Sequence, residues 1–147
     1  MQFPTVTGSN LQRSKLTLPQ DLEGGRNLVF VAFQQWQQTQ VDTWIPFVRQ
    51  LEDNYPGLRY YEVPTIRPLN RLARTFINEG MRAGIPDPVA RERTITLYLD
   101  KRAFREALQL PGEDDINVLL LDRQGRVLWR AEGAFTVEKG ESLAATL

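Results

Sequence analysis

Short hydrophobic runs alternate along this chain with segments in which apolar residues recur at helical spacing. Leu28 to Phe33 is an unbroken apolar run, which is typical of a strand covered on both faces. Shorter runs rich in aromatic and β-branched residues predict further strands. These are expected at residues 58–63, 93–99, 116–121 and 126–131.

The first segment in which apolar residues recur at helical spacing comes after the loop that follows Phe33. We expect this helix to begin between Thr39 and Asp42, because either side-chain oxygen can accept a hydrogen bond from a free backbone N–H. Pro46 removes one hydrogen bond from the helix and should bend it. The apolar positions expected to face the core are Val41, Trp44, Ile45, Val48 and Leu51.

A second helix is expected between Pro68, which suits a first-turn position, and Gly84, which suits its end. Its apolar residues keep an i, i+3, i+4, i+7 spacing, so we expect that side to be buried. They are Leu69, Leu72, Ala73, Phe76, Ile77 and Met81. The opposite side is rich in arginine, and residues 84–92 are expected to form a loop.

The order of these elements predicts the fold class. Residues 3–24 indicate a short hairpin or an extended arm at the N-terminus. Strands then alternate with helices, and the chain closes on a hairpin around Gly125, so we expect an α/β fold with a mixed central sheet flanked by helices. No linker or internal repeat divides the sequence, so residues 1–147 are expected to form a single domain.

Composition narrows the possible functions. The 18 basic and 18 acidic side chains balance, which argues against a general electrostatic role on nucleic acid. The absence of cysteine and histidine excludes thiolate catalysis, Ser-His-Asp triads and the commonest metal ligands, and we expect no cofactor or metal. No apolar run is long enough to span a membrane. With no signal peptide visible in Met1–Gly8, a cytoplasmic location is expected by default.

Three pieces of the sequence resemble the thioredoxin-like superfamily, in its peroxiredoxin and thiol-disulfide-reductase branch. They are the run Leu28–Phe33 followed by Trp36, Pro46 in the next helix, and Leu119 to Gly133, which is similar to the family's strand, Asp-x-x-Gly turn and strand. The resemblance covers nearly the whole chain. It implies a three-layer thioredoxin-like fold.

The residues that carry the family's chemistry are missing. If Trp36 matches the tryptophan before the Cys-x-x-Cys motif, the cysteine positions hold Gln37 and Gln40. If Pro46 is the anchor, as in peroxiredoxins, the peroxidatic position holds Val41. The family's cis-proline position falls on Ile116 or a neighbour, where a non-proline cis bond would cost about 2.5–4 kcal/mol. We therefore expect a trans peptide there, and no thiol oxidoreductase or peroxidase activity.

A second, narrower resemblance lies at the C-terminus. Asp122 to Gly133, followed by Thr136, Glu138 and Glu141–Leu143, is similar to the C-terminal part of the mitochondrial ATP-synthase assembly chaperones, which are themselves thioredoxin-like. This resemblance spans less than a quarter of the chain. It implies an assembly or interaction role rather than catalysis.

The loop in place of the redox site holds the first candidates for binding a ligand or partner: Trp36, Gln37, Gln40 and Asp42. An open helix N-terminus favours anions, so a small polar or anionic ligand would stack on Trp36 here. The alternative is that the glutamines only solvate the helix end. Asp115, in an acidic turn expected to face the loop, is a further candidate; it would either fill the anion site itself or lie in an exposed polar turn.

Basic residues give a second candidate surface. Arg82 and Arg91, with the arginine-rich side of the second helix, would suit an acidic partner or a phosphate group. The alternative is a solvated helix face. This surface has no interleaved exposed aromatic residues, so we expect no nucleic-acid binding.

Two carboxylates provide the third hypothesis. Glu62 lies at the end of the second strand, where α/β sheets bind ligands, and Asp87 lies in the loop expected nearby. As a pair they would do acid/base work in a non-redox enzyme; alternatively, Glu62 pairs with Arg82 or Arg91. We favour a redox-inactive binding, chaperone or assembly module for another protein or a small polar ligand, with no catalytic residue. The sequence leaves the oligomeric state open.

Overall fold

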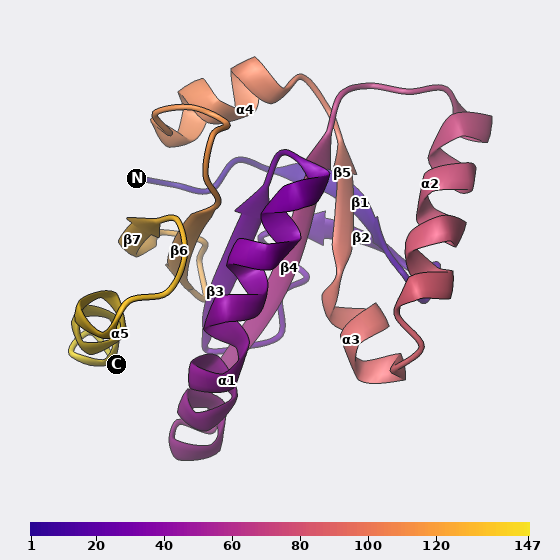
Figure 1. The fold of residues 1–147 in the computed structure, drawn as a ribbon. Coiled ribbons are helices and arrows are strands. Elements are labelled where there is room, and N and C mark those ends of the chain that lie inside the picture. Colours follow the sequence, from indigo (N-terminus) through magenta and orange to yellow (C-terminus); the bar gives the residue numbers. More distant parts are fainter.

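The computed structural model describes residues 1–147 and contains a seven-stranded mixed sheet in the order β2-β1-β5-β4-β3-β6-β7 (Figure 1). β4 is parallel to β3 and β5, and the other neighbouring strands are antiparallel. The strands are β1 (Val6–Asn10), β2 (Lys15–Leu18), β3 (Arg26–Ala32), β4 (Leu58–Ile66), β5 (Ile95–Tyr98), β6 (Asn117–Asp122) and β7 (Val127–Glu132). The helices are η1 (Gln35–Gln37, a 3₁₀ turn), α1 (Gln38–Asn54), α2 (Arg71–Gly84), α3 (Pro88–Arg93), α4 (Lys101–Leu108) and α5 (Val137–Ala144).

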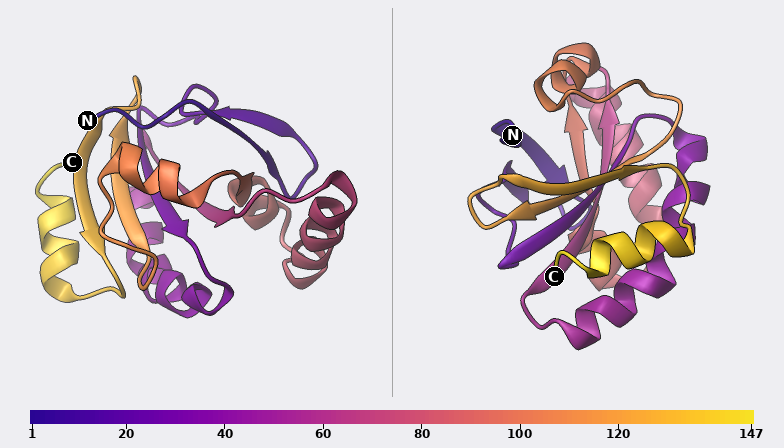
Figure 2. Two further views of the ribbon diagram at one scale, coloured as in Figure 1. Left: turned by 90° about the horizontal axis from the view of Figure 1, so that it is seen from above. Right: turned by 90° about the vertical axis from the view of Figure 1, so that its left-hand side faces the viewer.

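Burial on both faces of the sheet explains the apolar run of β3. Successive side chains of a strand point to opposite faces, so Val29 and Val31 lie in one core while Leu28 and Phe30 lie in the other. All four are fully buried. α4 contributes to the first core, and α1 and α5 contribute to the second (Figure 2). The predicted α/β fold, with helices flanking a mixed central sheet, is confirmed.

The N-terminal residues form the hairpin that was one of the two predicted alternatives. β1 pairs antiparallel with β2 and also with β5, so the hairpin extends one edge of the sheet. Phe3 and Leu18, on either side of β1, are buried in the same core as α4. The ring of Phe3 meets that of Phe104 edge to face, with centroids 5.6 Å apart.

The start of α1 differs from the prediction. The helix begins at Gln38, directly after η1, and neither Thr39 nor Asp42 caps it. The hydroxyl of Thr39 instead donates to the carbonyl of Trp36 (3.0 Å), and Asp42 accepts from the side chain of Gln38 (2.9 Å). The 3₁₀ turn leads the backbone into the helix without a side-chain cap. Of the positions predicted to face the core, Val41, Trp44, Val48 and Leu51 are buried, and Ile45 is partly buried against the same core.

The second helix contradicts the prediction more strongly. α2 starts at Arg71, and Asn70 caps it by accepting from the N–H of Ala73 (2.8 Å), so Pro68 lies outside the helix. No residue of α2 is buried, and the side chains of Leu72 and Phe76 are each 81% exposed. The expected burial of this apolar side was wrong because no other element covers the part of α2 that carries these two residues.

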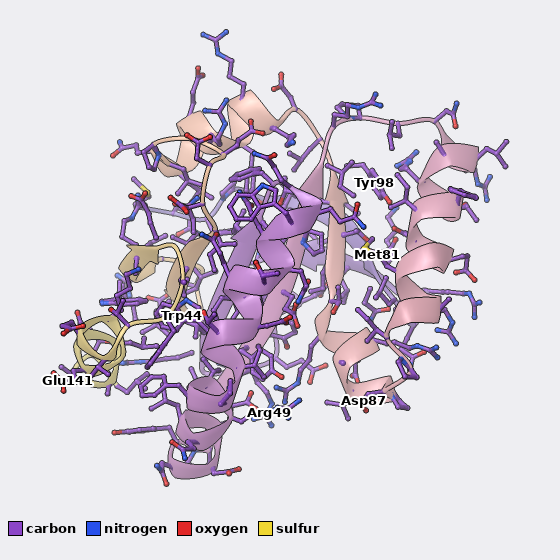
Figure 3. All side chains as sticks on the ribbon, viewed as in Figure 1. Trp44, Arg49, Met81, Asp87, Tyr98 and Glu141 are labelled. Carbon is purple, nitrogen blue, oxygen red and sulfur yellow. The ribbon has the colours of Figure 1, made fainter.

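Polar contacts attach α2 to β5, an interior strand of the sheet, instead. Oδ1 of Asn78 accepts from the hydroxyls of Thr96 (3.1 Å) and Tyr98 (2.6 Å), both on β5. Figure 3 shows the side chain of Tyr98 between β5 and α2. α2 therefore stands at the side of the molecule with one apolar stripe facing solvent.

The segment between α2 and β5 also differs from the prediction. Residues 88–93 form the short helix α3 rather than a loop, and Asp87 caps it by accepting from the N–H of Val89 (3.2 Å). The strand predicted at 58–63 continues to Ile66 as β4. No helix of the protein combines the length and apolarity that crossing a membrane requires.

Candidate functional site

Gln37 closes the loop that follows β3. Its side chain is completely buried. Oε1 accepts from the backbone N–H of Phe33 (2.8 Å), and Nε2 donates to the carbonyl of Glu113 (2.6 Å), 76 residues further along the chain. Gln34 donates to the same carbonyl (2.9 Å). The amide thus joins the loop to the segment before β6.

Gln40 forms a second bridge between the same segments. Its Nε2 donates to the carboxylate of Asp115 (2.7 Å), while its Oε1 accepts from the backbone N–H of Ile116 (2.9 Å). The acidic turn therefore faces the loop as the family resemblance implied. Asp115 accepts from a side-chain amide and not from the backbone N–H groups of the helix start. The peptide before Ile116 is trans, as predicted.

Glu113 links the segment before β6, which these glutamines contact, to α4. Its carboxylate forms ion pairs with Lys101 and Arg105 of α4, each at 3.0 Å. Lys101 also donates to the carbonyl of Phe33 (3.0 Å). The loop, the segment before β6 and the start of α4 are thereby tied into one hydrogen-bonded unit.

The structure separates the two alignments left open by the sequence. Gln37 directly precedes α1 and Gln40 lies in its first turn, beside the segment where the family has its cis-proline. Val41 is 1% exposed and packs in the core beneath α1. A reactive side chain at Val41 would be sealed from substrate. The geometry favours the alignment in which Gln37 and Gln40 occupy the cysteine positions.

Glu62 lies next to the start of α1 and lacks a cationic partner. Its Oε1 accepts from Nε2 of Gln38 (2.9 Å), which also donates to Asp42 (2.9 Å). Burial raises the pKa of Glu62, while the hydrogen bond from Gln38 opposes that shift. Gln38 therefore bridges two carboxylates, Glu62 and Asp42, at the mouth of the loop.

The structure does not bring Glu62 and Asp87 together. Asp87 caps α3, at the opposite end of the molecule from the start of α1 (Figure 3). Arg82 donates to the carbonyl of Leu11 (2.6 Å), and Arg91 donates to the carbonyls of Ile85 (2.5 Å) and Arg82 (2.9 Å). The predicted pairing of Glu62 with Arg82 or Arg91 was wrong, because both arginines instead hold loops around α2 and α3 in place.

A groove of about 750 Å³ separates the loop from α2. Gln34, Gln35 and Gln38 line its wall on the loop side, while Phe76 and Met81 line the α2 side. None of its fourteen lining residues carries a charge. Trp36, which follows Gln35 in the chain, is 51% exposed.

Sequence reasoning missed this groove and the exposure of two α2 residues, Phe76, which lines the groove, and Leu72, which lies one turn earlier outside the lining. The signal was present, since both belong to the apolar side of an amphipathic helix. Periodicity alone predicts an apolar helix side but does not say whether another element covers it. Gln34 and Gln38 were also missed as contacts of the loop.

The sequence as a whole matches one family model. Residues 1–147 match the model of the ATP10 protein family. The chain belongs to this family. The match covers every residue, so the similarity to ATP-synthase assembly chaperones, expected only for the C-terminal part, extends over the whole chain. A search of curated proteins found no match.

Solved structures resemble the fold at low sequence identity. A thiol-disulfide oxidoreductase from Bacteroides fragilis is 9% identical, with a TM-score of 0.62 and 100% of both chains covered. A thiol:disulfide interchange protein from Bacteroides sp. is 17% identical, with a TM-score of 0.62 and 98% of this chain and 86% of that chain covered. BsSco, of the Sco family of cytochrome c oxidase assembly proteins, is 10% identical, with a TM-score of 0.65 and 99% and 91% coverage. These likenesses confirm the thioredoxin-like fold.

Proposed function

We propose that this protein is a redox-inactive assembly module that holds an apolar segment of a partner protein in the groove between the loop and α2. The observation that carries the proposal is the 81% exposure of Leu72 and Phe76 on a helix with no buried residue. Exposed apolar side chains of this size on a helix face commonly mark an interaction surface. Membership of the ATP10 protein family supports a partner that belongs to ATP synthase.

The groove supports an uncharged occupant. Charged residues make up 24% of the chain, yet none lines the groove. Phe76, Ile77 and Met81 supply apolar surface on one wall, and glutamine amides supply hydrogen-bonding groups on the other. A charged segment would lose its hydration here without gaining an opposite charge, which disfavours it.

The bridges from Gln37 and Gln40 support binding by keeping the loop wall rigid. A surface that is already ordered loses less conformational entropy when a partner docks. The family resemblance aligns these two positions with the redox cysteines; here they carry amides that fasten the loop to the segment before β6. The role of the loop in this proposal is to shape a surface, and no electron transfer is involved.

The hypothesis of a small polar ligand stacked on Trp36 remains a prediction. The hypothesis of an enzyme that pairs Glu62 with Asp87 has no common site to support it, since each carboxylate is held by a different element. We therefore argue only the assembly role further.

Site-specific photocrosslinking in the native host tests the proposal. Phe76 is replaced with the photoreactive p-benzoylphenylalanine, and Arg49, an exposed residue of α1 outside the groove, is replaced in the same way as the matched control. The expected result is a discrete adduct from position 76 that contains a subunit of ATP synthase and is weakened by Leu72→Ser. Equal labelling from both positions, or no adduct from position 76, would overturn the proposal.

A further inference from the structure

A second hollow lies on the other side of α2, between this helix and the N-terminal hairpin. It has a volume of about 400 Å³, within the range of roughly 300–1,000 Å³ typical of ligand pockets. Lys15 of β2 contributes one side, and Arg71 and Arg74 of α2 contribute another. None of its lining residues is acidic.

The three basic residues around this hollow have no carboxylate partner. Each is exposed, and no ion pair joins any of them to a carboxylate. In contrast, Arg13, in the turn of the same hairpin, is paired with Glu79 of α2 at 2.5 Å. Because the chain as a whole has zero net charge, three uncompensated cations around one hollow form a distinct local positive field.

Contacts with β5 hold one of these cations in place. The guanidinium of Arg74 lies over the ring of Tyr98, with Cζ 5.7 Å from the ring centroid, a separation at which the ring face attracts a cation. The hydroxyl of Tyr98 donates to Asn78 (2.6 Å), which fixes the ring against α2. The same hollow contains the hydroxyl-bearing residues Ser9 and Thr75, which can donate to an anion.

From this arrangement we propose that the hollow between α2 and the N-terminal hairpin binds a phosphate group. Arginine matches phosphate oxygens with two parallel donors, and lysine adds a compact charge. A doubly charged phosphate is attracted more strongly to three nearby cations than a singly charged carboxylate is. The phosphate belongs either to a soluble phosphate compound or to the headgroup of an anionic lipid. The site is separate from the uncharged groove and does not depend on the proposed assembly role.

Calorimetric titration of the full chain with pyrophosphate tests for the soluble source. Removing the two arginines with Arg71→Gln/Arg74→Gln should weaken binding about tenfold or more, because each charge-assisted hydrogen bond contributes that much. Lys15→Gln should weaken it as well. The matched control Arg49→Gln, an exposed arginine on α1 away from the hollow, should leave the affinity unchanged. Circular dichroism verifies that each variant is folded.

Vesicle sedimentation tests for the lipid source. Vesicles of phosphatidylcholine with phosphatidylglycerol should retain the wild-type chain more than vesicles of phosphatidylcholine alone, and pyrophosphate should displace it. Binding in either arm that is lost in the double arginine variant supports the proposal and identifies the source. Absence of binding in both arms, or binding retained in the folded double variant, overturns it.

Discussion

The side-chain amide of Gln37 donates to the carbonyl oxygen of Glu113 at 2.6 Å, and this contact joins the loop after β3 to the segment before β6. In the thioredoxin-like fold these two segments form the redox site. Here Gln37, one of the two residues that the family resemblance aligns with the cysteines, is completely buried. The amide therefore belongs to the structural framework, and we propose the neighbouring groove as the surface for function.

Replacing Gln37 with alanine should destabilise the protein. Gln37→Ala leaves the buried N–H of Phe33 without its acceptor, and an unpaired buried donor costs about 1–3 kcal/mol. Urea unfolding measures the loss. The control Gln35→Ala, at an exposed residue of the same turn, should change the free energy of unfolding by less than about 0.5 kcal/mol. Equal losses in the two variants would contradict the bridging role of Gln37.

Glu62 should make the stability of the protein depend on pH. Burial raises its pKa above the ordinary value of 4.5, so the folded state holds the proton more tightly than the unfolded state does. The contribution of Glu62 to the free energy of unfolding therefore falls as the pH rises from 4.5 through the raised pKa. Below 4.5 the penalty is absent.

The neutral variant Glu62→Gln removes this penalty and keeps an acceptor for the amide of Gln38. It should therefore melt at a higher temperature than the wild type at neutral pH, and the difference should disappear in acid. Thermal melts at several pH values measure this. A variant that is less stable than the wild type at neutral pH would show that the charged form of Glu62 is favoured in the folded state.

The exposed side of α2 should tolerate polar substitution. Phe76→Ser removes an apolar side chain that is 81% exposed, so the free energy of unfolding should change by less than about 1 kcal/mol. Phe30→Ala, in the core, should cost about 3–5 kcal/mol. Denaturant titration distinguishes the two. A large loss for Phe76→Ser would mean that this side of α2 is covered in solution.

The ion pair between Arg93 and Glu52 should contribute more than the surface pairs do. Nη1 of Arg93 contacts both carboxylate oxygens at 2.8 Å, and its guanidinium lies 4.5 Å from the ring centroid of Tyr60. Glu52→Gln should cost about 1–3 kcal/mol. Breaking the exposed Arg102–Glu106 pair with Glu106→Gln should cost less than about 0.5 kcal/mol. Comparable effects in chemical denaturation would refute this ranking.

The strands of the sheet could be predicted from the sequence because a short apolar run indicates a buried strand. The run at Leu28–Phe33 has the composition of a strand with both faces covered, and both faces of β3 are buried. The family resemblance further predicted that Asp115 faces the loop. These features depend on short segments or on a layout shared by many proteins.

The candidate site was harder to predict because it depends on contacts between distant segments. Nothing in the loop sequence shows that Gln37 would reach Glu113, 76 residues away. The spacing of Leu72 and Phe76 predicted an apolar helix side, but it contained no information on whether another element covers that side. The arginines expected to bind a partner, Arg82 and Arg91, bind backbone carbonyls because the chain folds back on itself around α2 and α3.

The level of assembled ATP synthase in a native host that lacks this protein tests the central claim most directly. Complementation with the wild type should restore the assembled complex, and the control Arg49→Gln, at an exposed residue of α1 outside the groove, should do the same. Leu72→Ser/Phe76→Ser, expressed at the same level and folded, should not. Full rescue by this double variant, or no effect of deleting the protein on the level of the complex, would contradict a function based on the apolar surface of α2.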